Sequence, residues 1–311
     1  MTITKFFRFV IFCGPIILTF SACSASRGTG REPVQDQHYL APKLIGSISN
    51  SEITESSGLA ASKCQPDVLW THNDSGDGPF IYAMSKTGET LGKWRVPGAE
   101  NTDWEDIAEF KDKAGKCFIY LGEIGDNQSK RAVHQIYRLR EPTVKKGAPS
   151  GEQVETAEVA EKLDFSYADG NHDAETLMVN PKTADIYVLS KRISGPSGVY
   201  KIKSEFGANT PLVAEKLTEI SVPAIPNGYL TGGDISPDGR RVIISDYTAG
   251  YELVLPENST VFDDIWKQEP TVVELGKRKV GESACYSADG SVIYASSEGK
   301  NAPIYEIKRR D

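Results

Sequence analysis

Short apolar runs separated by turn residues recur along most of the chain. The clearest of them reads apolar-Tyr-x-apolar, with tyrosines at positions 82, 137, 200 and 305 and a weaker copy at 251. Successive tyrosines are 51 to 63 residues apart. Runs of β-branched and aromatic residues between turns are typical of strands, so each copy predicts one strand of a repeated sheet.

Each repeat contains further runs of the same kind. First runs, which follow an acidic or small polar residue, lie at 57–60, 102–110, 175–178, 233–235 and 282–285. Second runs lie at 68–71, 118–121, 186–189, 242–244 and 292–295, and fourth runs at 90–96, 162–165, 212–220 and 271–275. The tyrosine runs come third, so the pattern predicts four strands in each repeat.

Turn chemistry at 236–239, 287–290 and 180–183 predicts hairpins between the first and second strands. The last repeat lacks a fourth strand, which residues 43–48 can supply. The sequence therefore predicts an all-β fold, a β-propeller of five four-stranded blades closed by this N-terminal strand. The linker at 142–161 leaves six blades as the alternative, although its Lys, Gly, Glu and Pro content favours an exposed insertion.

The N-terminus has the pattern of a secretory signal, expected at residues 1–22. Lys5 and Arg8 precede an apolar run that is too short to span a membrane as an ordinary helix. The small residues that end at Cys23 resemble a bacterial lipobox, and a plain signal peptide is the alternative. We therefore expect lipidation of Cys23, a tether at 23–39, the propeller at 40–311, and an exported protein anchored in the periplasm or outer membrane.

Composition changes this picture little. The chain has 311 residues, 39% of them hydrophobic, and a net charge of −8, which is ordinary for a globular protein and disfavours a nucleic-acid partner. We expect a monomer.

Cys64 and Cys117 occupy equivalent points in successive repeats, which predicts a disulfide between neighbouring blades. Cys285 lies in a first run and is expected to be a small buried apolar residue.

The first strand of each propeller blade lines the central channel, so residues at its start are expected to converge on the axis. The predicted metal ligands are Glu55, Ser57, Glu105, Glu175, Gly233 and Glu282. Two carboxylates about 4 Å apart repel by roughly 4 kcal/mol at an effective dielectric constant near 20, so such a group needs protons or a cation. Oxygen ligands from several segments favour Ca²⁺ over Mg²⁺, and the chain has no zinc-type Cys/His cluster.

Polar residues at the ends of the second strands are expected on the same face. Candidate catalytic bases there are Asp74, Asp126 and Asp246, and His72 and His172 lie near the same rim. Candidate ligands for a small anionic substrate are Asn73, Asn127, Arg131, Lys191 and Arg192. Ordinary turns and solvated surface cations are the alternative interpretation of these residues, and Trp104 is expected to pack between blades.

Several motifs resemble a family of exported bacterial β-propellers often described as phytase-like or esterase-like. The resemblance spans most of the mature chain and is carried by residues 55–59, 73–76, 103–108, 125–127 with Arg131, and 137–142. Glu282-Ser283-Ala284-Cys285 is similar to an inner strand of the calcium-activated apyrases, five-bladed propellers with an axial Ca²⁺. That similarity implies calcium ligands at Glu105, Glu175 and Glu282. Gly233 departs from the side-chain ligand expected there, and the long acidic motifs of true β-propeller phytases are missing.

Two functions remain open on this evidence. One is a calcium-dependent hydrolase of phosphoesters, in which the ion holds and polarises an anionic substrate. The other is a non-catalytic envelope protein with a structural calcium and a face that binds a glycan or a protein. Propellers host both kinds of function, so the fold alone does not choose between them.

Overall fold

The computed structural model describes residues 37–145 and 154–310, and these residues form an all-β structure. The expected signal peptide, Cys23 with its lipid and most of the tether lie outside the described residues. Tyr39, placed at the end of the expected tether, is already buried and forms a β-bridge with Arg309. None of the described helices has the length and apolar character needed to cross a membrane.

The strands expected from the sequence are all present, and consecutive strands of one repeat pair antiparallel. The first strands are β2 (Ser56–Ala61), β6 (Trp104–Lys111), β11 (Ala174–Val179), β15 (Gly232–Ile235) and β19 (Ser283–Tyr286). The second strands are β3 (Val68–Asn73), β7 (Cys117–Glu123), β12 (Ile186–Ser190), β16 (Arg241–Ser245) and β20 (Val292–Ser296). The third strands are β4 (Phe80–Ser85), β8 (His134–Arg140), β13 (Ser197–Ile202), β17 (Gly250–Val254) and β21 (Pro303–Lys308). The fourth strands are β5 (Thr90–Arg95), β10 (Glu161–Tyr167), β14 (Leu212–Ile220), β18 (Thr271–Val273) and β1 (Lys43–Ser47).

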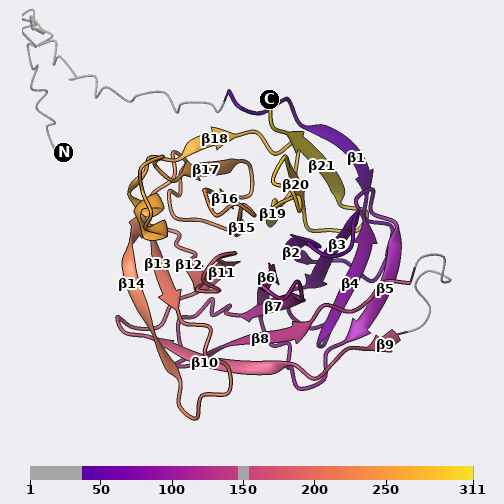
Figure 1. Cartoon of the computed structure of the whole chain (residues 1–311), viewed down its shortest axis with the longest axis horizontal. Helices are drawn as coiled ribbons and strands as arrows, with labels where there is room; N and C mark the ends of the chain where they lie inside the picture. The colour runs from indigo at the N-terminus through magenta and orange to yellow at the C-terminus, as the bar shows by residue number, and fades with distance from the viewer. Residues whose placement is uncertain (1–36, 146–153, 311) are drawn as a thin grey trace, which may run out of the picture. The chain divides into compact units, whose positions relative to one another are not determined.

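The first strands form a ring within residues 37–310. β6 packs beside β2 and β11, β15 packs beside β11 and β19, and β19 packs beside β2 (Figure 1). The expected closing strand is confirmed, because β1 pairs antiparallel with β21 near the end of the chain. The starts of the first strands are thereby brought together from distant parts of the sequence.

Two features depart from a simple repeat of separate four-stranded sheets. β10 and β14 pair in parallel, and this pairing joins the second and third repeats into one eight-stranded sheet. The described part of the linker at 142–161 contributes β9 (Val154–Thr156), which pairs in parallel with β5. A 3₁₀ helix at Phe262–Lys267, not expected from the sequence, places Ile265 and Trp266 in the core.

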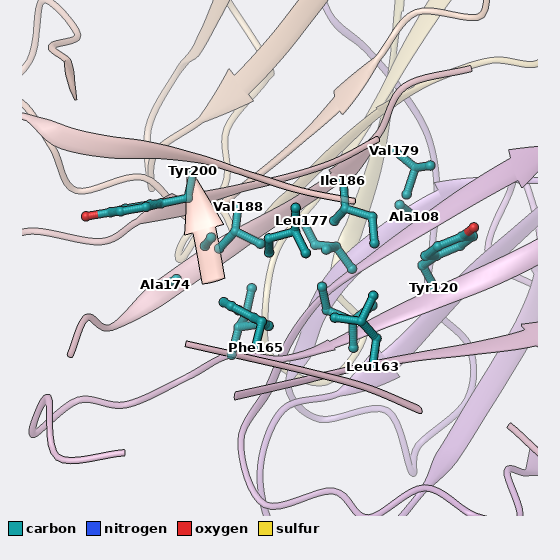
Figure 2. Close-up of a cluster of buried hydrophobic side chains, with 14 of the residues drawn as sticks. Ala108, Tyr120, Leu163, Phe165, Ala174, Leu177, Val179, Ile186, Val188 and Tyr200 are labelled. Atoms are coloured by element: carbon teal, nitrogen blue, oxygen red, sulfur yellow. The ribbon is translucent and has the colours of Figure 1, made fainter. Parts of the chain in front are cut away.

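The core consists of apolar layers between neighbouring repeats. Figure 2 shows one such layer, in which Leu163 and Phe165 of β10 face Leu177 of β11 and Val188 of β12. All six residues of β11 and all five of β12 are buried, which explains why their sequences are continuous runs without alternation. Burying each large apolar side chain stabilises the fold by about 1.5 to 3 kcal/mol.

The far ends of the first strands close in the expected hairpins. Gly239 and Gly290 both adopt positive φ, +65° and +72°, and each donates its N–H to the serine at the start of its turn. The predicted Cys64–Cys117 disulfide is confirmed, with the two Cα atoms 6.1 Å apart. Cys285 is a buried free thiol, also as expected.

Candidate functional site

Two Asp-x-Glu segments lie at the starts of the neighbouring strands β6 and β11. Together with Asp74, their carboxylates form two overlapping groups. One group contains Asp74, Asp103 and Glu105, and the other contains Glu105, Asp173 and Glu175. Within each group the carboxylate oxygens lie within 4.8 Å of one another, close enough to hold a metal ion. Glu105 belongs to both groups. We refer to these five residues as the carboxylate cluster.

β-Bulges position the two glutamates. Trp104 pairs with Glu123 and Asp106 with Gly122, so Glu105 is left without a partner in the ladder. The pairing of β11 with β12 skips Glu175 in the same way. A bulge re-aims a side chain that a regular strand would turn to the opposite face, and bulges are frequent beside functional sites.

The backbone approaches the cluster closely at Gly125. A Cβ atom at this position would lie 2.2 Å from Oε1 of Glu105 and 2.5 Å from Cγ of Asp103. Its N–H donates to the carbonyl oxygen of Asp103 at 3.2 Å. Only glycine fits there, so the loop after β7 forms one wall of the cluster.

The electrostatics of the cluster are those of crowded, desolvated carboxylates. Burial, followed by the charges of its neighbours, raises the pKa of Glu105 well above its usual range. Burial raises the pKa of Glu175 to about 8 against the opposing effect of Lys191, and it raises the pKa of Asp74 to about 7. Without a bound cation, the fold therefore favours the protonated form of these carboxylates.

Two cations act on the cluster among the described residues, Arg131 on Asp103 and Lys191 on Asp173 and Glu175. Lys191, at the end of β12, forms an ion pair with Glu175, and its Nζ lies 4.7 Å from the ring centre of Tyr229 and 5.3 Å from that of Tyr247. The carboxylate of Glu175 raises the pKa of this ammonium against the opposing effect of burial. Lys191 therefore stays charged and balances one of the carboxylates.

The predicted ligands divide into three kinds. Glu105 and Glu175 lie in the cluster, and Glu282 lies beside it, 3% exposed, with Oε2 unpartnered and a pKa raised to about 9 by burial and by Glu175. Glu55 is exposed, near Asp74 but outside both groups. Neither Ser57 nor Gly233 joins the cluster: the Ser57 hydroxyl donates to the carbonyl oxygen of Glu105 at 2.6 Å, and Gly233 is buried between strands.

Of the candidate bases, only Asp74 faces the cluster with a free atom. Its Oδ1 is buried without a hydrogen-bond partner among the described residues. Asp126 accepts the Arg131 N–H at 2.7 Å, and Asp246 accepts the N–H groups of Thr248 and Ala249 and the hydroxyl of Tyr251. Both carboxylates stabilise turns through these bonds, and their catalytic role stays a prediction.

Two predicted substrate ligands are likewise committed to the fold. The Asn73 amide accepts the N–H groups of Thr54 and Glu55 and donates to Glu52 and Asp77. The Arg131 guanidinium pairs with Glu123 at 2.8 Å and donates to Gly125 and Gln135. Asn127, Lys191 and Arg192 instead line an open hollow beside the cluster.

The two histidines differ in position. His72 is fully buried against Trp104, with its Nδ1 3.0 Å from the Asn73 carbonyl oxygen, and burial lowers its pKa to about 4. The expectation that it lies at the rim is wrong, because it belongs to the core. His172 does lie at the rim, where Nε2 is 2.9 Å from Oδ1 of Asp169. Trp104 packs in the core between sheets, as expected.

Asp103 and Asp173 are cluster residues that the sequence interpretation missed as ligands. The available signal was the repetition of Asp-x-Glu at the starts of two first strands, which occupy equivalent positions in their repeats. The prediction considered only the glutamate of each Asp-x-Glu segment and therefore missed the two aspartates.

Deeper in the ring, two aspartates bind the backbone. Asp106 accepts the N–H of Ile107 at 2.8 Å and that of Leu177 on β11 at 2.9 Å. Asp234 accepts the N–H of Ile235 at 2.8 Å and that of Tyr286 on β19 at 3.0 Å. Each side chain links one first strand to the next.

No family model matches the chain, and no curated protein matches its sequence.

Proposed function

We propose that this protein is an exported, lipid-anchored five-bladed β-propeller that binds Ca²⁺ at the carboxylate cluster and hydrolyses phosphoesters there. The ring of first strands, the antiparallel units of four strands and the pairing of β1 with β21 support the propeller. The observation that carries the function is the cluster itself, in which five carboxylates meet one lysine.

The residues fit a hard cation. Asp103, Glu105, Asp173 and Glu175 offer oxygen atoms from two neighbouring strand starts, and Gly125 leaves room that a side chain would fill. Glu282 adds an unpartnered buried oxygen at the edge. Ca²⁺ accepts six to eight oxygen ligands in flexible geometry, which suits a site assembled from loops and bulges.

A bound ion would supply electrophilic polarisation of a phosphoryl oxygen. The chain's own contribution is a proton acceptor and a second positive charge. Oδ1 of Asp74 takes a proton from the attacking water as its oxygen bonds to phosphorus, the ester bond breaks, and solvent protonates the departing alcohol. Lys191 holds Glu175 in place through its ion pair.

The second candidate is the non-catalytic envelope protein with a structural ion. The hydrogen bonds that hold Asp126 and Asp246 in turns favour it, since among the three candidate bases only Asp74 has a buried carboxylate oxygen without a partner in the described residues. In that case the same cluster stabilises the fold, and the rim binds a glycan or protein ligand. Membrane attachment through Cys23 belongs to both proposals.

One experiment separates these functions. The exported full-length protein is stripped with chelator, its calcium affinity is measured by calorimetry, and phosphate release from a set of phosphomonoesters is followed with and without Ca²⁺. We expect calcium-dependent turnover that falls at least about a hundredfold in Asp74→Asn, in line with loss of a general base, while calcium still binds. Glu89→Gln, an exposed carboxylate outside the site, is the control.

Turnover that persists in chelator would contradict calcium catalysis. Calcium binding without turnover of any ester would favour the binding protein. Mass spectrometry of the exported chain tests the anchor, for which a diacylglyceryl cysteine at position 23 is expected.

A further inference from the structure

A hollow of about 400 Å³ opens beside the carboxylate cluster. Four loops form it: those that follow β7 and β12 and those that precede β11 and β15. Asp173 and Lys191 belong to both the hollow and the cluster surroundings. A molecule in the hollow would therefore lie against the ion-binding carboxylates, within the size range of small-ligand pockets.

The positive charge that lines the hollow favours an anion. Arg192 is exposed there, and no described carboxylate lies within 4.0 Å of its guanidinium nitrogens. Its backbone, in contrast, is held by a bridge to Gly228 on the neighbouring loop. Arginine presents a fork of donors that matches phosphate oxygens, so an exposed guanidinium on a fixed backbone suits phosphate recognition, and Glu219 is the carboxylate that its charge reaches.

The walls of the hollow favour a polyhydroxylated body. Apart from Ile193, its side chains are polar or charged, including the imidazole of His172, and its one phenol ring belongs to Tyr229. That ring is fixed edge-on against Tyr247, with centroids 5.1 Å apart, and under the ammonium of Lys191. Several hydrogen-bonding groups around a single fixed ring suit a sugar better than an alkyl chain or a flat heterocycle.

A second hollow, of about 340 Å³, lies on the other side of Asp103 and Asp126. Its arginine, Arg131, is already bound to Glu123, Gly125 and Gln135, and its lysine, Lys130, donates to Gln128 at 2.6 Å. This hollow therefore offers an anion less uncommitted positive charge than the first.

We infer that the hollow beside Lys191 and Arg192 is the substrate subsite, and that its ligand is a sugar phosphate or similar phosphorylated polyol. Arg192 binds the phosphate, and Tyr229 supports the sugar ring. This inference rests on the proposed function for its chemistry but concerns binding, which is measurable without turnover.

Binding and turnover are tested with glucose 6-phosphate, glucose and 4-nitrophenyl phosphate on the calcium-loaded full-length protein. We expect Arg192→Ala to raise KM for glucose 6-phosphate at least about tenfold, with a smaller effect on kcat, and Arg192→Lys to recover part of the loss. Tyr229→Ala is expected to weaken the binding of glucose 6-phosphate more than the binding of 4-nitrophenyl phosphate. Lys130→Ala, in the second hollow, is the matched control and should leave KM unchanged.

Saturation-transfer NMR reads binding directly. Binding of glucose 6-phosphate that is lost in Arg192→Ala supports the inference even without phosphate release, and then the hydrolase proposal alone fails. The inference is overturned if no probe binds the wild-type protein, if Arg192→Ala and Tyr229→Ala bind normally, or if only Lys130→Ala loses binding. Calcium affinity, measured by calorimetry in the same variants, should stay constant and separates ion binding from substrate binding.

Discussion

Glu105 and Asp106 are consecutive residues of β6, and the fold treats their carboxylates in opposite ways. Asp106 accepts backbone N–H groups from its own strand and from β11, and Asp234 does the same between β15 and β19. Glu105, released from the ladder by a bulge, accepts no hydrogen bond on its carboxylate among the described residues and crowds against other acids.

The difference shows how to separate structural from functional acids in one ring. A buried carboxylate that receives N–H donors is satisfied by the fold, and its removal leaves those donors unpaired. A buried carboxylate that faces other carboxylates needs a proton or a bound cation instead. The distribution of backbone donors is therefore more informative here than burial, which both kinds share.

The largest expected effect is on the structural acids. Asp106→Ala removes the acceptor of two buried N–H groups and should lower the free energy of unfolding by about 2 to 5 kcal/mol, measured by urea denaturation in chelator. Asp106→Asn, which keeps one acceptor oxygen, should lose about half as much. An unchanged urea midpoint combined with lost calcium binding would place Asp106 among the ligands and break the comparison.

Glu105→Gln should weaken calcium binding without destabilising the fold. We expect calcium affinity to fall at least about tenfold, because one charged ligand shared by both groups is lost. In chelator the same variant should be as stable as the wild-type protein or more stable, since repulsion within the cluster decreases. Calorimetry checks the calcium affinity, and thermal denaturation checks the stability. Marked destabilisation in chelator would make Glu105 a structural residue.

The pH dependence of stability tests the cluster as a whole. Asp74, Glu175 and Glu282 have pKa values raised to about 7, 8 and 9, so between about pH 4.5 and these values the folded state holds protons that the unfolded state releases. The stability in chelator should therefore be greatest below this window and fall as pH rises through it. Saturating Ca²⁺ should make the stability less dependent on pH. A Tm that rises with pH in chelator would contradict the raised pKa values of these three carboxyl groups.

The strands were predictable because their signal is local. Each run carries its own β-branched and aromatic residues and its own turn, and the unmatched run near residue 45 indicated how the last sheet closes. The parallel pairing of β10 with β14 was not predictable, because it joins outer strands whose own sequences fit either arrangement. The 3₁₀ helix at Phe262–Lys267 is too short for periodicity to reveal.

The candidate site was only partly predictable for a related reason. Glu105 and Glu175 follow from the repeat, and Asp103 and Asp173 could have followed from it. The roles of Asn73, Asp126 and Asp246 depend on which N–H groups a folded loop presents to them. Residue type gives no information on that, because the same side chains serve as turn acceptors and as ligands.

The pairing of Lys43 with Glu306 has a consequence for how the molecule is made. The strand that completes the last sheet, β1, precedes every other described strand in the sequence, and its partner, β21, follows them all. Contacts between residues so distant in sequence form slowly, because a long loop must close before they stabilise anything. A ribosome-bound or truncated chain would hence remain an open arc, and a circular permutant that joins the paired ends should be well tolerated.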